Sequence, residues 1–177
     1  GGDTAKRVEK LQEGIVKFPE NQYFFANLVD YYSSSNQNDK AMQFANDMLA
    51  KDPNNKLYLY VKAYLYHNMK DYEKAIEFYK KTLDVDPTYA EACSNLGLVY
   101  LLQAQDYADK APTDINDPNY ATAQANIKKF YEEAKPYYEK ARELKPDQKD
   151  LWLQGLYRVY YNLNMGPEFE AIEKLMN

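Results

Sequence analysis

The chain has few of the residues that build covalent cross-links or metal cages. It has a single cysteine, Cys93, and a single histidine, His67, among 177 residues. One cysteine excludes an internal disulfide, and one cysteine with one histidine cannot supply the ligands of a His/Cys zinc cage. The sequence therefore predicts no metal site, and nothing in it implies a cofactor.

Long apolar runs and excess positive charge are also missing, and chain breakers are few. No apolar run approaches the roughly 20 residues that span a bilayer, so no membrane span is expected. With 6 glycines, 8 prolines and 45% hydrophobic residues, the composition is that of a folded domain. The formal net charge of −5 argues against nucleic acid or an anionic membrane surface as the main partner.

What the chain does have is a period of 34 residues. The period is kept by Pro19, Pro53 and Pro87, by Tyr32, Tyr66 and Tyr100, and by Ala41 and Ala75. Ala134 joins the alanine column once 25 inserted residues are subtracted. A fixed interval of this length is typical of a solenoid built from repeated helix pairs.

One period resembles the tetratricopeptide repeat (TPR), a helix–turn–helix unit. The residues that carry this resemblance are Leu59, Ala63, Tyr66, Ala75, Tyr79 and Pro87. In the third period Cys93, Leu96, Gly97 and Tyr100 are similar to the family pattern W-x2-L-G-x2-Y, and Trp152 takes the Trp position in the fourth. The resemblance implies an all-α fold, a right-handed TPR superhelix (α-solenoid) of about nine helices in antiparallel pairs, with a helical-hairpin insertion in one repeat.

The period predicts a single TPR domain over residues 1–177. It divides into a half repeat at 4–18, full repeats at about 22–55 and 56–89, a third at 90–148 with the insertion 104–128, and a degenerate capping unit at 149–177. We expect the alanine column to lie where paired helices cross closely, because only a small side chain permits that approach. The tyrosine column is expected on the buried stripe of the first helices.

Local signals predict several helix ends. Asp71 is the expected N-cap of a second helix, and Thr88 with Glu91 fits a capping box. Asp147 is a candidate cap in the fourth repeat, and Gly166-Pro167 should open the last helix. That helix, 168–176, is expected to turn Phe169, Ile172 and Leu175 inward.

The resemblance also implies a binding surface. In TPR proteins the first helices line a concave groove that holds a peptide or a helix of a partner. By position, the groove residues here are Asn27, Asp30, Tyr60, Tyr64, His67, Ser94, Asn95, Leu98, Gln154, Tyr157 and Tyr161. Tyrosine suits such a surface because it offers a large apolar face and one hydroxyl at a modest entropy cost. The alternative is that these side chains are simply exposed or contact only neighbouring helices.

One variant of the family clamps a C-terminal carboxylate with Lys and Asn side chains. The matching positions here hold Ala26, Asp30, Val61, Glu91 and Asn95. Only one Asn remains and two positions carry negative charge, so an acidic tail would be repelled. This specificity is excluded.

No constellation predicts catalysis. Cys93 is expected to be a small buried hydrophobe in the Trp position, and His67 has no nucleophile or positioned acid near it in sequence. A loop with Asp114, Asn116, Asp117 and Asn119 is similar to a calcium loop. An EF-hand needs Gly at the sixth place and Glu at the twelfth, where this chain has Asn119 and Ala125, so a solvated turn is the better interpretation.

The insertion supports two hypotheses. In the first, a long hairpin forms a partner-specific surface through Tyr107, Ile115, Tyr120, Ile127 and Tyr131. In the second, the hairpin folds onto the fourth repeat as added core. Two amphipathic helices are less expected from an accidental insertion than a structureless loop is.

Together these observations predict a non-enzymatic protein–protein interaction scaffold or adaptor that binds a peptide or helix of a partner. The alternative is structural self-assembly through stacking of terminal repeats, with self-association through the N-terminal half repeat. The half repeat at 4–18 is the second helix of a repeat whose first helix is missing, so we expect a longer array upstream. Gly1-Gly2 is similar to an expression-tag remnant, so a natural leader could have been removed. The resemblance to bacterial TPR proteins, often exported ones, implies the periplasm, with the cytoplasm as the alternative.

Overall fold

The computed structural model describes residues 2–18 and 21–176, and these contain helices and turns but no strand. The helices are α1 (Gly2–Lys17), α2 (Gln22–Ser34), α3 (Asn38–Lys51), α4 (Lys56–Asn68), α5 (Tyr72–Val85), α6 (Ala90–Ala108), α7 (Tyr120–Leu144), the 3-10 turn η1 (Lys149–Leu151), α8 (Leu153–Asn162) and α9 (Gly166–Glu173). The predicted all-α fold is confirmed. None of the described helices combines the length and the apolar character that a bilayer crossing requires.

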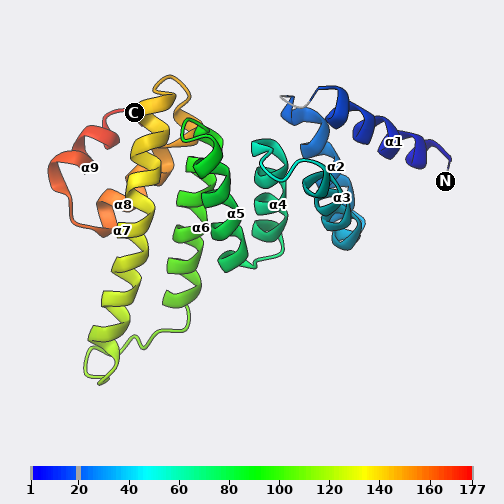
Figure 1. Cartoon of the computed structure of the whole chain (residues 1–177). Coiled ribbons are helices and arrows are strands. Elements are labelled where there is room, and N and C mark those ends of the chain that lie inside the picture. The colour runs from blue at the N-terminus through cyan, green and yellow to red at the C-terminus, as the bar shows by residue number, and fades with distance from the viewer. Residues whose placement is uncertain (1, 19–20, 177) are drawn as a thin grey trace. The chain divides into compact units, whose positions relative to one another are not determined.

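The chain divides into two compact units, residues 1–85 with α1 to α5 and residues 86–177 with α6 to α9. Within each unit every helix packs against the next one along the chain, as in an α-solenoid (Figure 1). The predicted organisation as one repeat domain, with the repeat boundaries given above, stays a prediction.

The alanine column is buried as predicted. Ala41 on α3 is 3% exposed, and Ala75 on α5 and Ala134 on α7 are fully buried. Each lies on the second helix of a pair, α2 with α3, α4 with α5 and α6 with α7, and each pair is in contact. A methyl group at these positions allows the two backbones to approach closely.

The tyrosine column is buried at two of its three positions. Tyr32 and Tyr100 are buried, as predicted. Tyr66 is half-buried, so the expectation is wrong there. Its ring stacks on Phe78 with 5.6 Å between centroids, and the Lys74 ammonium lies over the Tyr66 ring, 5.2 Å from its centre, so the ring packs against a partly exposed neighbour and a flexible side chain.

Three turns between the helices of a pair use a left-handed residue. Asn36, Lys70 and Asn164 have φ values of 53°, 60° and 55°. Asn36 and Lys70 are one period apart, and the next position on that count is Ala104. Ala104 is buried inside α6, which continues to Ala108 instead of turning. The insertion therefore begins where the repeat normally reverses direction.

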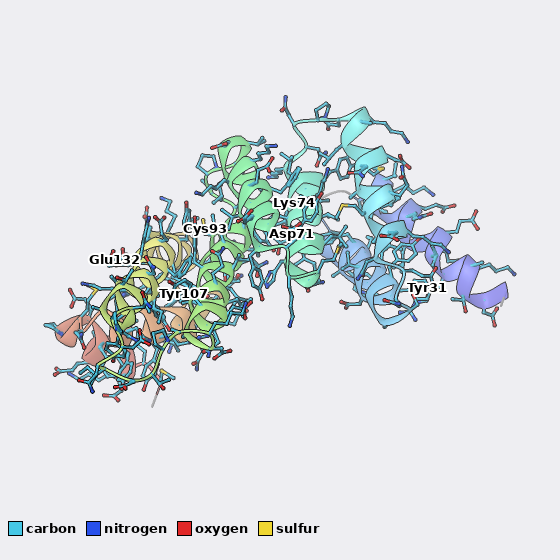
Figure 2. The ribbon with its side chains drawn as sticks, turned by 90° about the horizontal axis from the view of Figure 1, so that it is seen from below. Tyr31, Asp71, Lys74, Cys93, Tyr107 and Glu132 are labelled. Carbon is cyan, nitrogen blue, oxygen red and sulfur yellow. The ribbon has the colours of Figure 1, made fainter. Side chains whose placement is uncertain are left out.

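The two predicted caps before residue 90 have different outcomes. Asp71 caps α5, because its Oδ1 accepts from the Lys74 backbone N–H at 3.3 Å and its Oδ2 lies 3.3 Å from Lys74 Nζ (Figure 2). The capping box at Thr88 is wrong. Thr88 donates from both its backbone N–H and its hydroxyl to Asp86 Oδ1, at 2.9 and 2.6 Å, so it closes a turn before α6. The N-cap of α6 is Tyr89, without a side-chain cap.

The insertion lengthens α6 and α7 into a hairpin, as predicted. They are the longest of the described helices, with 19 and 25 residues, and they lie side by side, with the loop that joins them at the end away from α9 (Figure 1). α7 continues through Pro136, which is exposed. At the other end the Tyr138 ring packs between Gly97 of α6 and Gly155 of α8.

The fourth repeat differs from its prediction at both ends. Asp147 does not cap α8, which begins only at Leu153, after the short turn η1. Trp152 is the N-cap residue and is buried, and its Nε1–H donates to the Lys145 carbonyl at 3.0 Å. In the last helix Ile172 is buried, but Leu175 lies beyond α9 and is 40% exposed, so its predicted inward position is wrong.

Candidate functional site

The predicted groove residues of the first unit include three aromatic side chains on one face of α4. Tyr60, Tyr64 and His67 follow at intervals of four and three residues, which places them on the same side of the helix. Tyr60 is 5% exposed, whereas Tyr64 and His67 are half-buried. Tyr60 thus offers a partner little surface, and its contribution is to support the other two rings.

These rings belong to a connected aromatic cluster. Tyr60 stacks on Tyr64 with centroids 6.4 Å apart and contacts Tyr79 of α5 at 5.7 Å. Tyr64 meets His67 edge-on at 6.2 Å. Aromatic pairs at these distances add to the free energy gained by burial alone. Because Tyr79 is fully buried, the cluster anchors two partly exposed rings on a fixed base.

His67 is held neutral by its surroundings. Its Nδ1 lies 3.4 Å from the Tyr79 hydroxyl, a contact in which either group can donate. Burial lowers the pKa of the imidazole from its usual 6.5. A neutral imidazole can both donate and accept a hydrogen bond, which suits a recognition surface.

Asn27 and Asp30 of α2 are the other predicted groove residues of this unit. Asn27 is half-buried, and its Nδ2 donates to the Tyr23 carbonyl at 2.8 Å, which leaves the side-chain oxygen as an acceptor. Asp30 is exposed. Both are therefore open to a ligand, Asn27 through one atom and Asp30 through its carboxylate.

In the second unit the predicted groove residues differ in exposure. Ser94, Asn95 and Leu98 of α6 are half-buried, Gln154 of α8 is exposed and Tyr157 is half-buried. Tyr161 is 65% exposed, and its ring and that of Tyr157 lie 5.6 and 4.9 Å from Phe169 of α9. α8 and α9 thus form a second, partly exposed aromatic surface.

Cys93 is structural, as its place in the repeat predicted. Its side chain is 2% exposed in the interior of the second unit. Burial raises the pKa of the thiol to about 11, so it stays protonated at neutral pH. A protonated and enclosed thiol is a poor nucleophile.

The acidic loop is closed by its own hydrogen bonds. Asp114 Oδ1 accepts from the Asn116 backbone N–H at 2.9 Å, and Asp117 Oδ1 accepts from the Asn119 N–H at 2.7 Å. These are Asx turns, which explain the composition without an ion. In the part of the chain that the structure describes, no three His, Cys, Asp or Glu side chains converge as metal ligands would.

The five hairpin residues divide between surface and core. Ile115 and Tyr107 are 75% and 37% exposed, while Tyr120 and Ile127 are half-buried and Tyr131 is 8% exposed. The Tyr107 hydroxyl accepts from Asn126 Nδ2 at 2.8 Å, a contact across the hairpin. The exposed residues suit the hypothesis of a partner-specific surface and the buried ones suit that of added core, so both hypotheses stay open.

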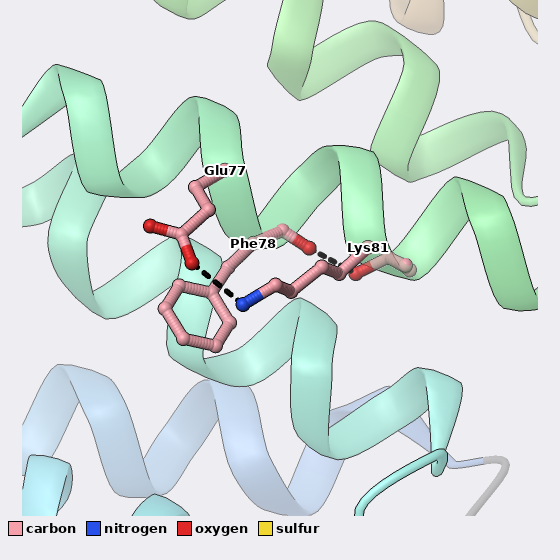
Figure 3. Close-up of polar contacts among 4 residues, drawn as sticks. Glu77, Phe78 and Lys81 are labelled. Carbon is pink, nitrogen blue, oxygen red and sulfur yellow. Dashed lines mark hydrogen bonds and ion pairs between the residues drawn. The ribbon is translucent and has the colours of Figure 1, made fainter.

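One charged and aromatic cluster was missed at the sequence level. The Nζ atoms of Lys62 and Lys81 lie 4.5 and 4.6 Å from the centre of the Phe78 ring, and Lys81 also donates to Glu77 at 2.6 Å (Figure 3). Burial, followed by the charge of Lys81, lowers the pKa of Lys62. A signal was present, because Lys62 stands one period from Leu28 and from Leu96, where the repeat carries leucine.

Comparisons with known proteins bear on the family. Models described as "TPR repeat" and "Tetratricopeptide repeat" match residues 63–103 in the first case, and residues 44–77 and 125–148 in the second. The photosystem I assembly protein Ycf3 of Cyanophora paradoxa is 28% identical over 100 residues, which are 56% of this chain and 51% of that protein. The chain thus spans about half the length of this curated relative.

Solved structures show the same architecture. The MamA protein superposes with a TM-score of 0.64 at 17% identity, over 98% of this chain and 80% of that chain. Human IFIT1, solved as a dimer with m7Gppp-AAAA, gives a TM-score of 0.72 at 22% identity, over 96% of this chain and 36% of that one. At these identities the likeness shows the fold alone.

Proposed function

Because the chain belongs to the tetratricopeptide repeat family, we propose that it is a non-enzymatic interaction scaffold that binds a peptide or helix of a partner protein on its first helices. The repeats point to a non-catalytic role, and the curated relative is by its name an assembly protein. The enclosed, protonated thiol of Cys93 is in keeping with such a role.

The observation that carries the proposal is the aromatic cluster on α4. Tyr64 and His67 are half-buried and rest on Tyr60 and Tyr79, which are buried. Rings that are already fixed lose little conformational entropy when a ligand docks, so more of the contact energy remains as affinity. Asn27 and Asp30 of the same unit would add directed polar contacts.

A second contact surface is proposed on α6 and α8. Tyr157 and Tyr161 supply its partly exposed aromatic area, and Leu98 a half-buried apolar side chain. Ser94, Asn95 and Gln154 complete the set with polar groups. Aromatic residues mixed with small polar ones are typical of protein-binding surfaces.

Site-specific photo-cross-linking tests this proposal. A benzophenone amino acid placed at Tyr64 or at Tyr157 should capture the same partner in extracts of the native organism. At Asp47, which is exposed on the second helix α3, it should not. Tyr64→Ala in the Tyr157 cross-linker background should weaken capture. Equal capture at all three positions would refute the proposed surface.

Self-assembly is the second candidate, and one observation favours it. Val16, Phe18 and Tyr23, at the junction of α1 and α2, are 59%, 58% and 61% exposed. Three large apolar side chains exposed this close together are typical of a contact surface. Light scattering over a range of protein concentrations should then show association that Phe18→Asp abolishes, and a constant monomer mass would exclude it.

A further inference from the structure

The α1–α2 pair carries a cleft whose charge is opposite to that of the chain as a whole. An open cavity of about 470 Å³ is lined by Asp3, Lys6, Arg7, Lys10, Leu11, Tyr23, Phe24 and Asn27. Three cations and one carboxylate give it a charge of +2, whereas the chain carries −5. Among the residues that the structure describes, no carboxylate lies within ion-pair distance of Lys6, Arg7 or Lys10.

An apolar floor lies beside these cations. Leu11 is 7% exposed, and Phe24 packs edge-on against Tyr23 with centroids 5.6 Å apart. The Phe24 ring lies directly on Gly14 of α1, where an added Cβ would come within 2.2 Å of ring atoms. The floor is therefore held in place from below, while Tyr23 is 61% exposed at the rim.

The repeat pattern indicates the shape of the occupant. One period after Arg7, Leu11 and Asn27 come Ala41, Ala45 and Val61. These three residues line an apolar pocket together with Phe25, Leu28 and Val29, which belong to helix α2. The equivalent surface one repeat later receives α2, the helix that precedes that pair along the chain. The α1–α2 cleft has the same place in the pattern, so its shape suits a helix.

The residue types differ, and the difference sets the chemistry. Arg7 stands in the alanine column, where a guanidinium prevents the close backbone crossing that Ala41 and Ala75 allow. Lys10 stands in the column of Phe44 and Phe78, and Asn27 is polar where the second repeat has Val61 and the third has Asn95. A helix that fits this cleft must bring carboxylates to the cations and an apolar side chain to Phe24.

We propose that the cleft between α1 and α2 docks an acidic amphipathic helix of a partner protein. Its carboxylates pair with Lys6, Arg7 and Lys10, and its apolar side chain rests on Phe24 and Tyr23. Charge complementarity carries the choice of partner, because opposite potentials favour the correct encounter and like charges exclude others. The inference rests on the proposed function in taking a protein segment as ligand, and Asn27 belongs to both surfaces.

Fluorescence anisotropy with two labelled helical peptides tests the proposal. The first is built of Glu, Ala and Leu with one Phe, and the second has Lys in place of every Glu. The acidic peptide should bind, the basic one should not, and binding should weaken as salt screens the charges. No binding of the acidic peptide up to about 1 mM, or equal binding of the basic one, overturns the proposal.

A matched pair of variants locates the contact. The variant Lys6→Glu/Arg7→Glu/Lys10→Glu should weaken binding at least about tenfold. The control Lys110→Glu/Lys128→Glu/Lys129→Glu makes the same change in net charge at exposed positions of the hairpin and should leave the affinity within about twofold. An equal loss in both triple variants overturns the proposed site. Circular dichroism checks that each variant keeps its helices.

Three further outcomes separate this inference from the proposed function and from self-association. If Tyr64→Ala abolishes peptide binding and the α1 variant does not, the surface on α4 stands and the cleft is not the site. If the α1 variant instead dissociates a dimer seen by light scattering, a second copy occupies the cleft and the partner proposal fails. If neither variant changes binding, the peptide binds elsewhere and the cleft proposal fails, while the cross-linking experiment alone decides the surface on α4.

Discussion

The Tyr138 ring occupies a slot between two glycines, and Gly155→Ala tests whether that slot has any spare room. A Cβ at position 155 would lie 2.2 Å from ring atoms Cε1 and Cζ, and one at position 97 would lie 2.7 Å from Cδ2 and Cε2. The ring is 5% exposed and confined from both sides. It cannot move away from one glycine without approaching the other.

The change in unfolding free energy caused by Gly155→Ala follows from two opposing effects. Forcing a methyl group into a packed interior costs about 1–3 kcal/mol. Replacing glycine by alanine inside a helix returns about 1 kcal/mol, because alanine has the higher helix propensity. The distance of 2.2 Å places Gly155→Ala at the upper end of the first range. We therefore expect the free energy of unfolding to fall by about 1–2 kcal/mol.

Urea denaturation followed by circular dichroism measures this change. Gly166→Ala is the control, because a Cβ there meets nothing within 4 Å, and its effect should stay within about 0.5 kcal/mol. Tyr138→Leu removes the far end of the ring. The double variant Gly155→Ala/Tyr138→Leu should therefore lose less unfolding free energy than the sum of the losses in the two single variants. Additive costs, or a Gly155→Ala protein as stable as wild type, would refute the reasoning.

Three more predictions concern local contacts. Burial lowers the pKa of His67, so below about pH 6.5 the unfolded chain binds more protons than the folded one, and stability must fall as the pH drops. The urea midpoints at about pH 7.5 and 5.5 should therefore differ less in His67→Gln than in wild type. An equal difference in the two proteins contradicts this. Trp152→Phe loses the hydrogen bond to the Lys145 carbonyl and should cost about 1–3 kcal/mol by urea denaturation, because that carbonyl then lacks its partner; an unchanged midpoint contradicts it. Lys70→Gly relieves a left-handed conformation and should stabilise the fold by about 0.5–1 kcal/mol, seen as a higher melting temperature. A lower melting temperature than wild type would contradict this.

The fold was predictable because the period is carried by residues with a backbone role. Pro53 and Pro87 stand just after the ends of α3 and α5, where proline disfavours a continued helix, and Ala41 and Ala75 permit close crossings. Such properties belong to single positions, so spacing alone reveals them. The start of α8 was not predictable in this way, because Trp152 is held at the N-cap by the Lys145 carbonyl, a tertiary contact.

The candidate site was predictable in position but not in availability. Counting along the repeat placed Tyr60, Tyr64 and His67 on one helix face, and the structure adds that Tyr60 is buried beneath other rings. Burial depends on side chains from α2 and α5, which no count along α4 contains. The cationic cleft was not predicted although Arg7 stands in the alanine column, because a departure from the repeat at one position does not show which side chains of the next helix lie beside it.

The left-handed turns have an architectural consequence. Asn36 and Lys70 each reverse the chain between the two helices of a pair, so a single residue at the turn sets how long the two helices are. At Ala104 the chain does not reverse, so α6 and α7 are longer than the other paired helices. Ala134 nevertheless keeps its buried place where the two helices cross. The length of a helix pair and the spacing of the buried alanine crossings along the repeat are thus independent of each other. Other loops or arms could be grafted at Asn36 or Lys70 as interchangeable attachments without disturbing the stack.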